Sequence, residues 1–186
     1  MKRTVKILVP ALMLALASSA AVAHPQAGAH AHGFVDGFMH PLTGIDHLLA
    51  MLAVGAWSAR QSSAQWLPPT FIGMVMVGML AGALGMAIPG LELGIALTVV
   101  AMGALIALAA RLPAAVGVAM VGGFAFMHGN AHGLELPTVP AAFGLLAASA
   151  LLVYGGRLLG RVGPALALKF SGAGIAATGM VLAAAL

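Results

Sequence analysis

The apolar stretch from Pro113 to Glu135 ends in His128-Gly-Asn-Ala-His132-Gly-Leu-Glu135, and the organisation of the chain can be worked out from it. A run of roughly 17–25 apolar residues is long enough to cross a bilayer as a helix. On a helix, His132 and Glu135 lie on the same stripe as His128, because they follow it by four and seven positions. Two imidazoles and a carboxylate on one stripe are suitable ligands for a divalent cation.

The composition excludes an ordinary water-soluble domain. Of the 186 residues, 62% are hydrophobic and only 6% are charged, and the mean hydropathy is +1.08. Soluble domains carry about a quarter charged residues. We therefore predict an all-α, polytopic membrane protein whose partner is the lipid bilayer. The net charge of +4 is then a topology signal rather than a sign of nucleic-acid binding.

The first 23 residues have the pattern of a cleavable signal peptide. Three basic residues precede an apolar run from Ile7 to Ala17, and Ala21-Val22-Ala23 forms an A-x-A cleavage site. The alternative is an uncleaved first transmembrane helix, but the run is short and Pro10 interrupts it. Cleavage after Ala23 would leave His24 as the first residue of the mature chain.

The segment from residue 24 to residue 39 is predicted to be a polar tail outside the membrane. Its histidines, His24, His30 and His32, are candidates for auxiliary metal capture. The alternative is a solvated leader in which histidines happen to occur, since a His-rich tract is only compositional evidence.

Residues 40–186 are predicted to form a domain of six transmembrane helices. Pro41 suits the first position of the first helix, which makes His40 its cap. Each stretch has the length that a bilayer crossing needs. The six predicted spans are residues 41–59, 67–88, 91–110, 113–135, 139–156 and 164–186.

The basic residues of this domain agree with one orientation. With the mature N-terminus outside, the loops after the first, third and fifth spans are cytoplasmic, and basic residues favour that side. The outward turns hold Glu92 and Glu135 instead. We therefore expect a multi-pass protein of the bacterial cytoplasmic (inner) membrane with a periplasmic N-terminus. The basic residues in question are Arg60, Arg111, Arg157, Arg161 and Lys169.

A second ionisable cluster, His40-Pro-Leu-Thr-Gly-Ile-Asp46-His47, stands at the start of the first span. The first span runs inward and the fourth runs outward, so this cluster and the one from His128 to Glu135 are predicted to share the outer part of the membrane. Ionisable groups in a membrane are costly and are functional by default. The alternative is that Asp46–His47 and the neighbouring pair on the fourth span are structural hydrogen-bonded pairs.

Small residues recur at helix-packing intervals beside the histidines. Gly78 and Gly82 form a GxxxG pattern, and Ala125, Gly129 and Gly133 follow one another by four. In a membrane such stripes let helix backbones approach closely. We expect a neighbouring helix to pack tightly there and to fix the imidazoles.

Ligand chemistry narrows the ion without choosing it. The chain has no cysteine, so only nitrogen and oxygen can hold a metal. Imidazole with carboxylate suits Ni(II), Co(II), Zn(II) and Cu(II) better than Mg²⁺ or Ca²⁺.

The two clusters together resemble the signature motifs of the HupE/UreJ family of hydrogenase and urease accessory proteins, which are regarded as nickel permeases. Met127 departs from the family pattern, which usually has Phe at this position; this is a packing change. The resemblance implies nickel(II) as the transported ion, with cobalt(II) as a second possibility. It also implies that the essential residues are His40, Asp46, His47, His128, His132 and Glu135.

A secondary permease for nickel uptake is thus the leading hypothesis, and no Walker motif indicates use of ATP. A membrane metal sensor or storage protein is the main alternative. An intramembrane metalloenzyme is disfavoured, because Gly129 stands where the HExxH metalloprotease motif has its general-base Glu. We therefore expect no enzymatic activity. The sequence leaves the oligomeric state open.

Overall fold

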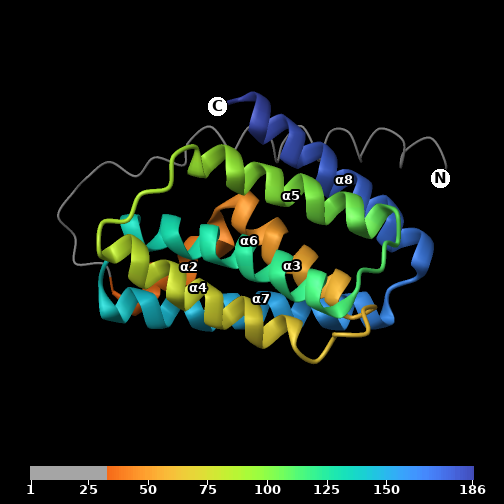
Figure 1. The fold of residues 1–186 in the computed structure, drawn as a ribbon, viewed down its shortest axis with the longest axis horizontal. Coiled ribbons are helices and arrows are strands. Elements are labelled where there is room, and N and C mark those ends of the chain that lie inside the picture. The colour runs from red at the N-terminus through yellow and green to blue at the C-terminus, as the bar shows by residue number, and fades with distance from the viewer. Residues whose placement is uncertain (1–32) are drawn as a thin grey trace. The chain divides into compact units, whose positions relative to one another are not determined.

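The computed structural model of the chain describes residues 33–186, which fold entirely into helices and their connections (Figure 1). The predicted signal peptide and the tail histidines His24, His30 and His32 lie outside the described residues. The helices are α2 (Phe34–Thr43), α3 (Ile45–Ser58), α4 (Leu67–Ala83), α5 (Leu91–Ala107), α6 (Ala114–Glu135), α7 (Val139–Val162) and α8 (Ala165–Ala184).

The helices associate in three groups, each held by close backbone contact. Helix α4 packs along α6, α5 packs along α8, and α2 with α3 packs along α7. Figure 1 shows α5 and α8 side by side. Glycines stand at all three contacts, where an added Cβ would overlap the backbone of the partner helix. Small residues allow this approach, which dispersion forces between helices then stabilise.

The contact between α4 and α6 confirms the predicted role of the glycine stripes. A Cβ on Gly129 would overlap the carbonyl oxygen of Val75, and one on Gly133 would overlap that of Met79. Gly78 in α4 faces α6 in the same way. Because both helices contribute glycines, α6 is held along its last three turns, where its histidines lie.

Helix α7 runs parallel to α2 and α3 and contacts both along its length. Gly37 faces Ala141, and farther along Gly156 faces Leu52; both pairs have the same numbering offset of 104. The close contact at Gly156 keeps α7 helical beyond the predicted end of the fifth span. The helix therefore continues through Arg157 and Arg161, which were expected in a loop, and stops at Gly163 before Pro164.

The first predicted span is two helices rather than one. The expectation that Pro41 starts a helix and that His40 caps it is wrong: α2 already begins at Phe34, and Pro41 lies in its last turn. The helix instead breaks at Gly44, whose extended backbone (φ −79°, ψ 112°) ends α2 and precedes α3. Residues 34–39, predicted as tail, thus belong to α2.

Hydrogen bonds tie the loops together at the end of the helices opposite this break. Trp57 Nε1 and Gln61 Nε2 both donate to the carbonyl of Ala110, each at 3.0 Å. Arg60 donates through Nε to Gly160 and through Nη2 to Gly163. These bonds connect the loops that follow α3, α5 and α7, so the three loops form one layer.

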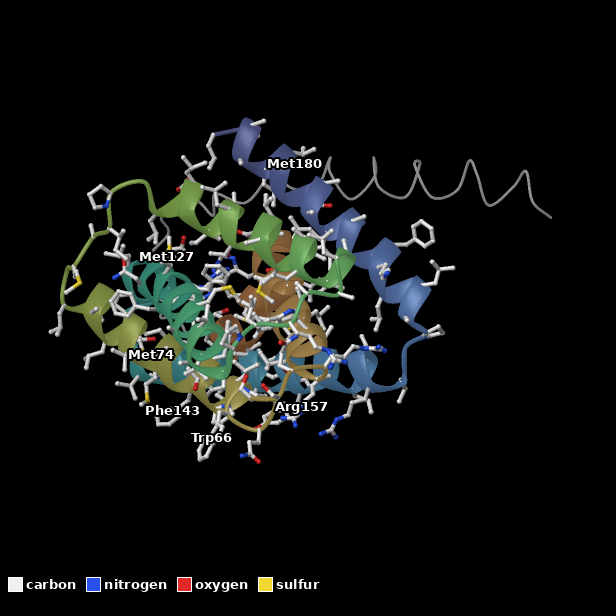
Figure 2. The ribbon with its side chains drawn as sticks, turned by 45° about the vertical axis from the view of Figure 1, so that its right-hand side comes forward. Trp66, Met74, Met127, Phe143, Arg157 and Met180 are labelled. Carbon is white, nitrogen blue, oxygen red and sulfur yellow. The ribbon has the colours of Figure 1, made fainter. Side chains whose placement is uncertain are left out.

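The outward-facing side chains of the described helices are strongly apolar. Phe170 is 72% exposed and Phe143 is 64% exposed, and Figure 2 shows Phe143 and Met180 at the outside of the helices. Helices α6, α7 and α8 are long and apolar enough to cross a membrane, whereas α3, α4 and α5 are apolar but shorter. An exterior of this kind is typical of a protein in contact with lipid.

Candidate metal centre

Four imidazole rings from three helices form one cluster, in which the rings from α3 and α6 are buried and that of His40 is partly exposed. The ring of His132 lies 4.3 Å from that of His47 and 4.9 Å from that of His40, measured between centroids. His47 also contacts His128, at 5.4 Å. One ring nitrogen from each of His40, His47 and His132 lies within 4.8 Å of the others, which allows a single ion to contact all three.

One carboxylate stands beside each half of this cluster. Glu135 Oε2 lies 3.0 Å from Nε2 of His40, and Asp46 Oδ1 lies 3.0 Å from Nδ1 of His47. Nδ1 of His47 is buried, and this carboxylate oxygen is its close polar neighbour. Oxygen donors are therefore available at the outer end of the row of nitrogen donors and beside His47.

The hydrogen bond of His128 fixes which of its nitrogens is free. Its Nδ1 lies 2.9 Å from the carbonyl oxygen of Phe124. A carbonyl oxygen only accepts, so Nδ1 carries the hydrogen and Nε2 keeps its lone pair. Nε2 is buried and has no partner. A backbone carbonyl behind the ring is the usual outer-shell support of a metal-binding histidine.

His132 is the least satisfied polar residue of the cluster. It is fully buried, and neither of its ring nitrogens has a hydrogen-bond partner in the described structure. An unsatisfied buried polar group costs about 1–3 kcal/mol. His128 and His132 both have such unsatisfied nitrogens. A metal ion that accepts their lone pairs would remove this cost.

The contacts place the six side chains in a fixed order. Helices α2 and α3 run antiparallel to α6, because residue 40 faces residues 132 and 135 while residue 47 faces residues 128 and 132. Starting from the more exposed end, the order is Glu135, His40, His132, His47 with Asp46, and His128. The structure thus brings together all six residues that the sequence predicted.

Asn130, inside the same motif, has a structural role that the sequence did not predict. Its Nδ2 donates to the carbonyl of Met86 at 2.7 Å. That carbonyl follows the turn in which Gly85 (φ +86°) ends α4, and the bonds from Gly85 to Gly82 and from Met86 to Ala81 form a Schellman motif. The left-handed glycine explains why α4 ends before the predicted residue 88.

An open cavity of about 490 Å³ adjoins the Glu135 end of the cluster. Glu92, at the start of α5, lines this cavity together with Glu135. Glu92 therefore shares a depression with the motif, which the sequence did not predict. Met127 in α6 lies against Gly94 in α5, consistent with the packing role expected for Met127.

This fold and this cluster define a class: a helical protein with an apolar exterior and one buried group of four imidazoles beside two carboxylates. The chain belongs to the HupE/UreJ family, since residues 12–182 match the family model described as HupE / UreJ protein. It is 42% identical over 136 residues to Protein HupE of Rhizobium leguminosarum bv. viciae, a match that covers 72% of this chain and 71% of that protein. No solved structure matches. The resemblance of the two motifs to this family of accessory proteins is thereby confirmed.

Proposed function

We propose that this protein is a secondary permease of the bacterial cytoplasmic membrane that carries nickel(II) inward for the maturation of a nickel enzyme. The single observation that carries the proposal is the row of four imidazoles, three of them buried, with unpartnered nitrogens on His128 and His132 and a carboxylate beside each of His40 and His47. Such a row can replace the water ligands of a divalent ion inside a membrane, where water is scarce.

The proposed orientation of the protein in the membrane follows from the separation of its acidic and basic side chains. In the described chain, Glu92 and Glu135 lie at the end of the helices that carries the cluster. Arg60, Arg111 and Lys169 line a cavity at the opposite end. The positive-inside rule makes the second end cytoplasmic. Counting α2 and α3 as one crossing gives six crossings, with the cluster on the periplasmic side.

The break at Gly44 supports a transport role. Interrupted helices are common at the substrate sites of secondary transporters, because irregular backbone is tolerated in a membrane where it lines a polar site. Here the break falls between His40 in α2 and His47 in α3.

The order of the side chains supports a stepwise path. The hydrated ion enters through the cavity beside Glu92 and Glu135 and first contacts His40 and His132. It then passes to His47 with Asp46 and finally to His128, the innermost histidine. His47 and His132 are in ring contact, so an ion can gain the next nitrogen before it loses the previous one. Low-cost exchange between neighbouring sites is what permits release as well as capture.

The family membership supports nickel as the cargo, with cobalt(II) as a competing ion. The donor set alone suits several late divalent metals. The choice of nickel therefore rests on the relationship to hydrogenase and urease accessory proteins.

Uptake into proteoliposomes tests the proposal. Purified protein is reconstituted into vesicles, radiolabelled nickel is added outside, and cobalt and zinc are added as competitors. We expect protein-dependent accumulation that cobalt inhibits and that His132→Ala abolishes. The matched control is Thr98→Ala, which removes a buried hydroxyl that bonds only its own helix, at Ile95. Tight nickel binding without any accumulation would refute a permease and would indicate a storage or sensor protein.

A further inference from the structure

A small cavity lies between α3, α5 and α8, at the end of the helices opposite the histidine cluster. Its volume is about 100 Å³, and most of the side chains that line it are apolar. Helix α8 packs along α5 but makes few contacts with α3, which leaves this space between them. Almost all of α8 is at least partly exposed, its buried residues being Gly172 and Gly179. The cavity therefore lies between helices at the edge of the fold.

Three cationic side chains line this cavity, and each comes from a different part of the chain. Arg60 follows α3, Arg111 follows α5, and Lys169 lies near the start of α8. All three residues are exposed. The positive-inside rule accounts for the side of the membrane on which they lie, but it does not account for their meeting at one space between helices.

No acidic side chain of the protein lies near these cations. The chain has four Asp and Glu residues, and within the described structure the ion pairs of these carboxylates are made with histidines. Arg60 donates to two backbone carbonyls, which hold its guanidinium group without neutralising its charge. The cavity thus lacks the anion that would complement it. The four acidic residues, all at the end that carries the histidine cluster, are Asp36, Asp46, Glu92 and Glu135.

We propose that this cavity binds the phosphate group of an anionic phospholipid from the cytoplasmic leaflet. Basic pockets between transmembrane helices on the cytoplasmic side are known binding sites for anionic headgroups. Arg111 offers a planar fork of N–H donors that matches two phosphate oxygens, and Lys169 adds a compact positive charge. The apolar walls suit the beginning of the acyl chains. A lipid held in this way would connect α8 to α3 across the gap between them.

Quenching by a brominated lipid tests this assignment, because bromine quenches tryptophan fluorescence at short range and Trp57 lines the cavity. The chain has two tryptophans, so Trp66→Phe leaves Trp57 as the reporter. Full-length protein in detergent is titrated with brominated phosphatidylglycerol, which is anionic, or with brominated phosphatidylcholine, which is zwitterionic. We expect saturable quenching at lower concentrations of the anionic lipid. Inorganic phosphate should not reverse it, and reversal would show that the cavity binds a soluble anion instead.

Substitutions made in the same Trp66→Phe background locate the lipid further. Arg111→Gln and Lys169→Gln should each weaken binding of phosphatidylglycerol by about 5-fold, the effect of one cation near a membrane surface. Lys169→Arg keeps the charge and should keep the affinity. The matched control is Arg161→Gln, which removes an exposed cation of α7 outside the cavity and should leave the affinity unchanged. Equal quenching by the two lipids, or equal effects of Arg161→Gln and Lys169→Gln, would refute the lipid site. The assay contains no nickel, so that result would leave the proposed permease unaffected.

Discussion

The ring of His47 lies against the ring of His132, with centroids 4.3 Å apart and ring planes at 75°. The two residues come from α3 and α6, whose closest partners are other helices: α3 packs along α7, and α6 packs along α4. Glycine contacts in those two groups set the positions of the backbones that carry the rings. The geometry of the cluster therefore depends on contacts that include none of its ligands.

The first prediction concerns the two rings in contact. Replacing either His47 or His132 by Ala should weaken nickel binding by at least about 10-fold, since even the loss of an outer-shell partner costs that much. The double variant should lose less than the sum of the two free energies, because residues of one site are coupled. Isothermal titration of the purified variants measures both effects. Strictly additive losses would mean that the two histidines bind separate ions.

The second prediction concerns the contact between α4 and α6. Gly129→Ala places a methyl group on the carbonyl oxygen of Val75, so the helices must move apart. Overpacking of this kind costs about 1–3 kcal/mol, and it should also weaken nickel binding by displacing His128 and His132.

The matched control is Gly123→Ala in the same helix, where an added Cβ meets nothing within 4 Å. That change should leave nickel affinity unaltered and should not lower the thermal unfolding temperature, because Ala favours a helix more than Gly does. Thermal unfolding in detergent and nickel titration check both variants. Equal effects of the two substitutions would show that the helices do not depend on this contact.

The third prediction concerns Ala109, the non-glycine residue with positive φ (+50°) in the described chain. It ends α5 in a Schellman turn, with Ala109 N bonded to Ile106 and Ala110 N bonded to Leu105. Glycine adopts this conformation without a steric penalty, so Ala109→Gly should stabilise the protein by about 1 kcal/mol.

Ala104→Gly, in the interior of α5, is the opposite control, because glycine inside a helix destabilises it by roughly 0.5–1 kcal/mol. Thermal unfolding should rise for the first variant and fall for the second. A lower unfolding temperature for Ala109→Gly would contradict the observed backbone conformation. Nickel affinity should stay the same in both, since α5 contributes no histidine to the cluster.

The sequence was sufficient to predict the helical fold and the convergence of the two ionisable clusters. The positions of the basic residues predicted the direction in which each span crosses the membrane. These directions in turn predicted that both ionisable clusters lie at the same depth. The glycine stripe from Gly129 to Gly133 predicted the tight neighbour of α6, because only small residues permit such an approach.

Features that depend on tertiary contact could not be predicted in this way. The first span was predicted as one helix from residue 41 to residue 59, because hydropathy does not mark where a helix breaks. The break at Gly44 is a change of backbone conformation, three residues after the proline inside α2. The extension of α7 past Gly156 depends on its contact with Leu52, which only the assembled helices provide. The role of Asn130 likewise requires the turn at Gly85 to be in place.

The fourth prediction concerns the tail that precedes the described residues. His30 and His32 are expected to gather ions without fixed geometry, so replacing both by Ala should lower uptake when nickel is scarce and leave it unchanged when nickel is saturating. Uptake measured across a range of nickel concentrations separates these cases. Loss of transport at saturating nickel would show that these histidines are essential rather than auxiliary.

The last prediction concerns protons as competitors of the metal. A histidine binds a metal through a neutral nitrogen, so protonation of the imidazoles must oppose binding. Lowering the pH from about 7.5 through and below the ordinary titration range of imidazole, about 6.5, should weaken nickel affinity progressively, because burial opposes protonation of a histidine. Equilibrium binding is the appropriate measurement, because uptake would also respond to any proton gradient that drives it. Binding should release protons at the acidic end of this range, where metal displaces them from the imidazoles, and titration in buffers of different ionisation enthalpy measures their number. Nickel affinity that stays unchanged down to the lowest pH at which the protein remains folded would exclude imidazole nitrogens as the principal ligands.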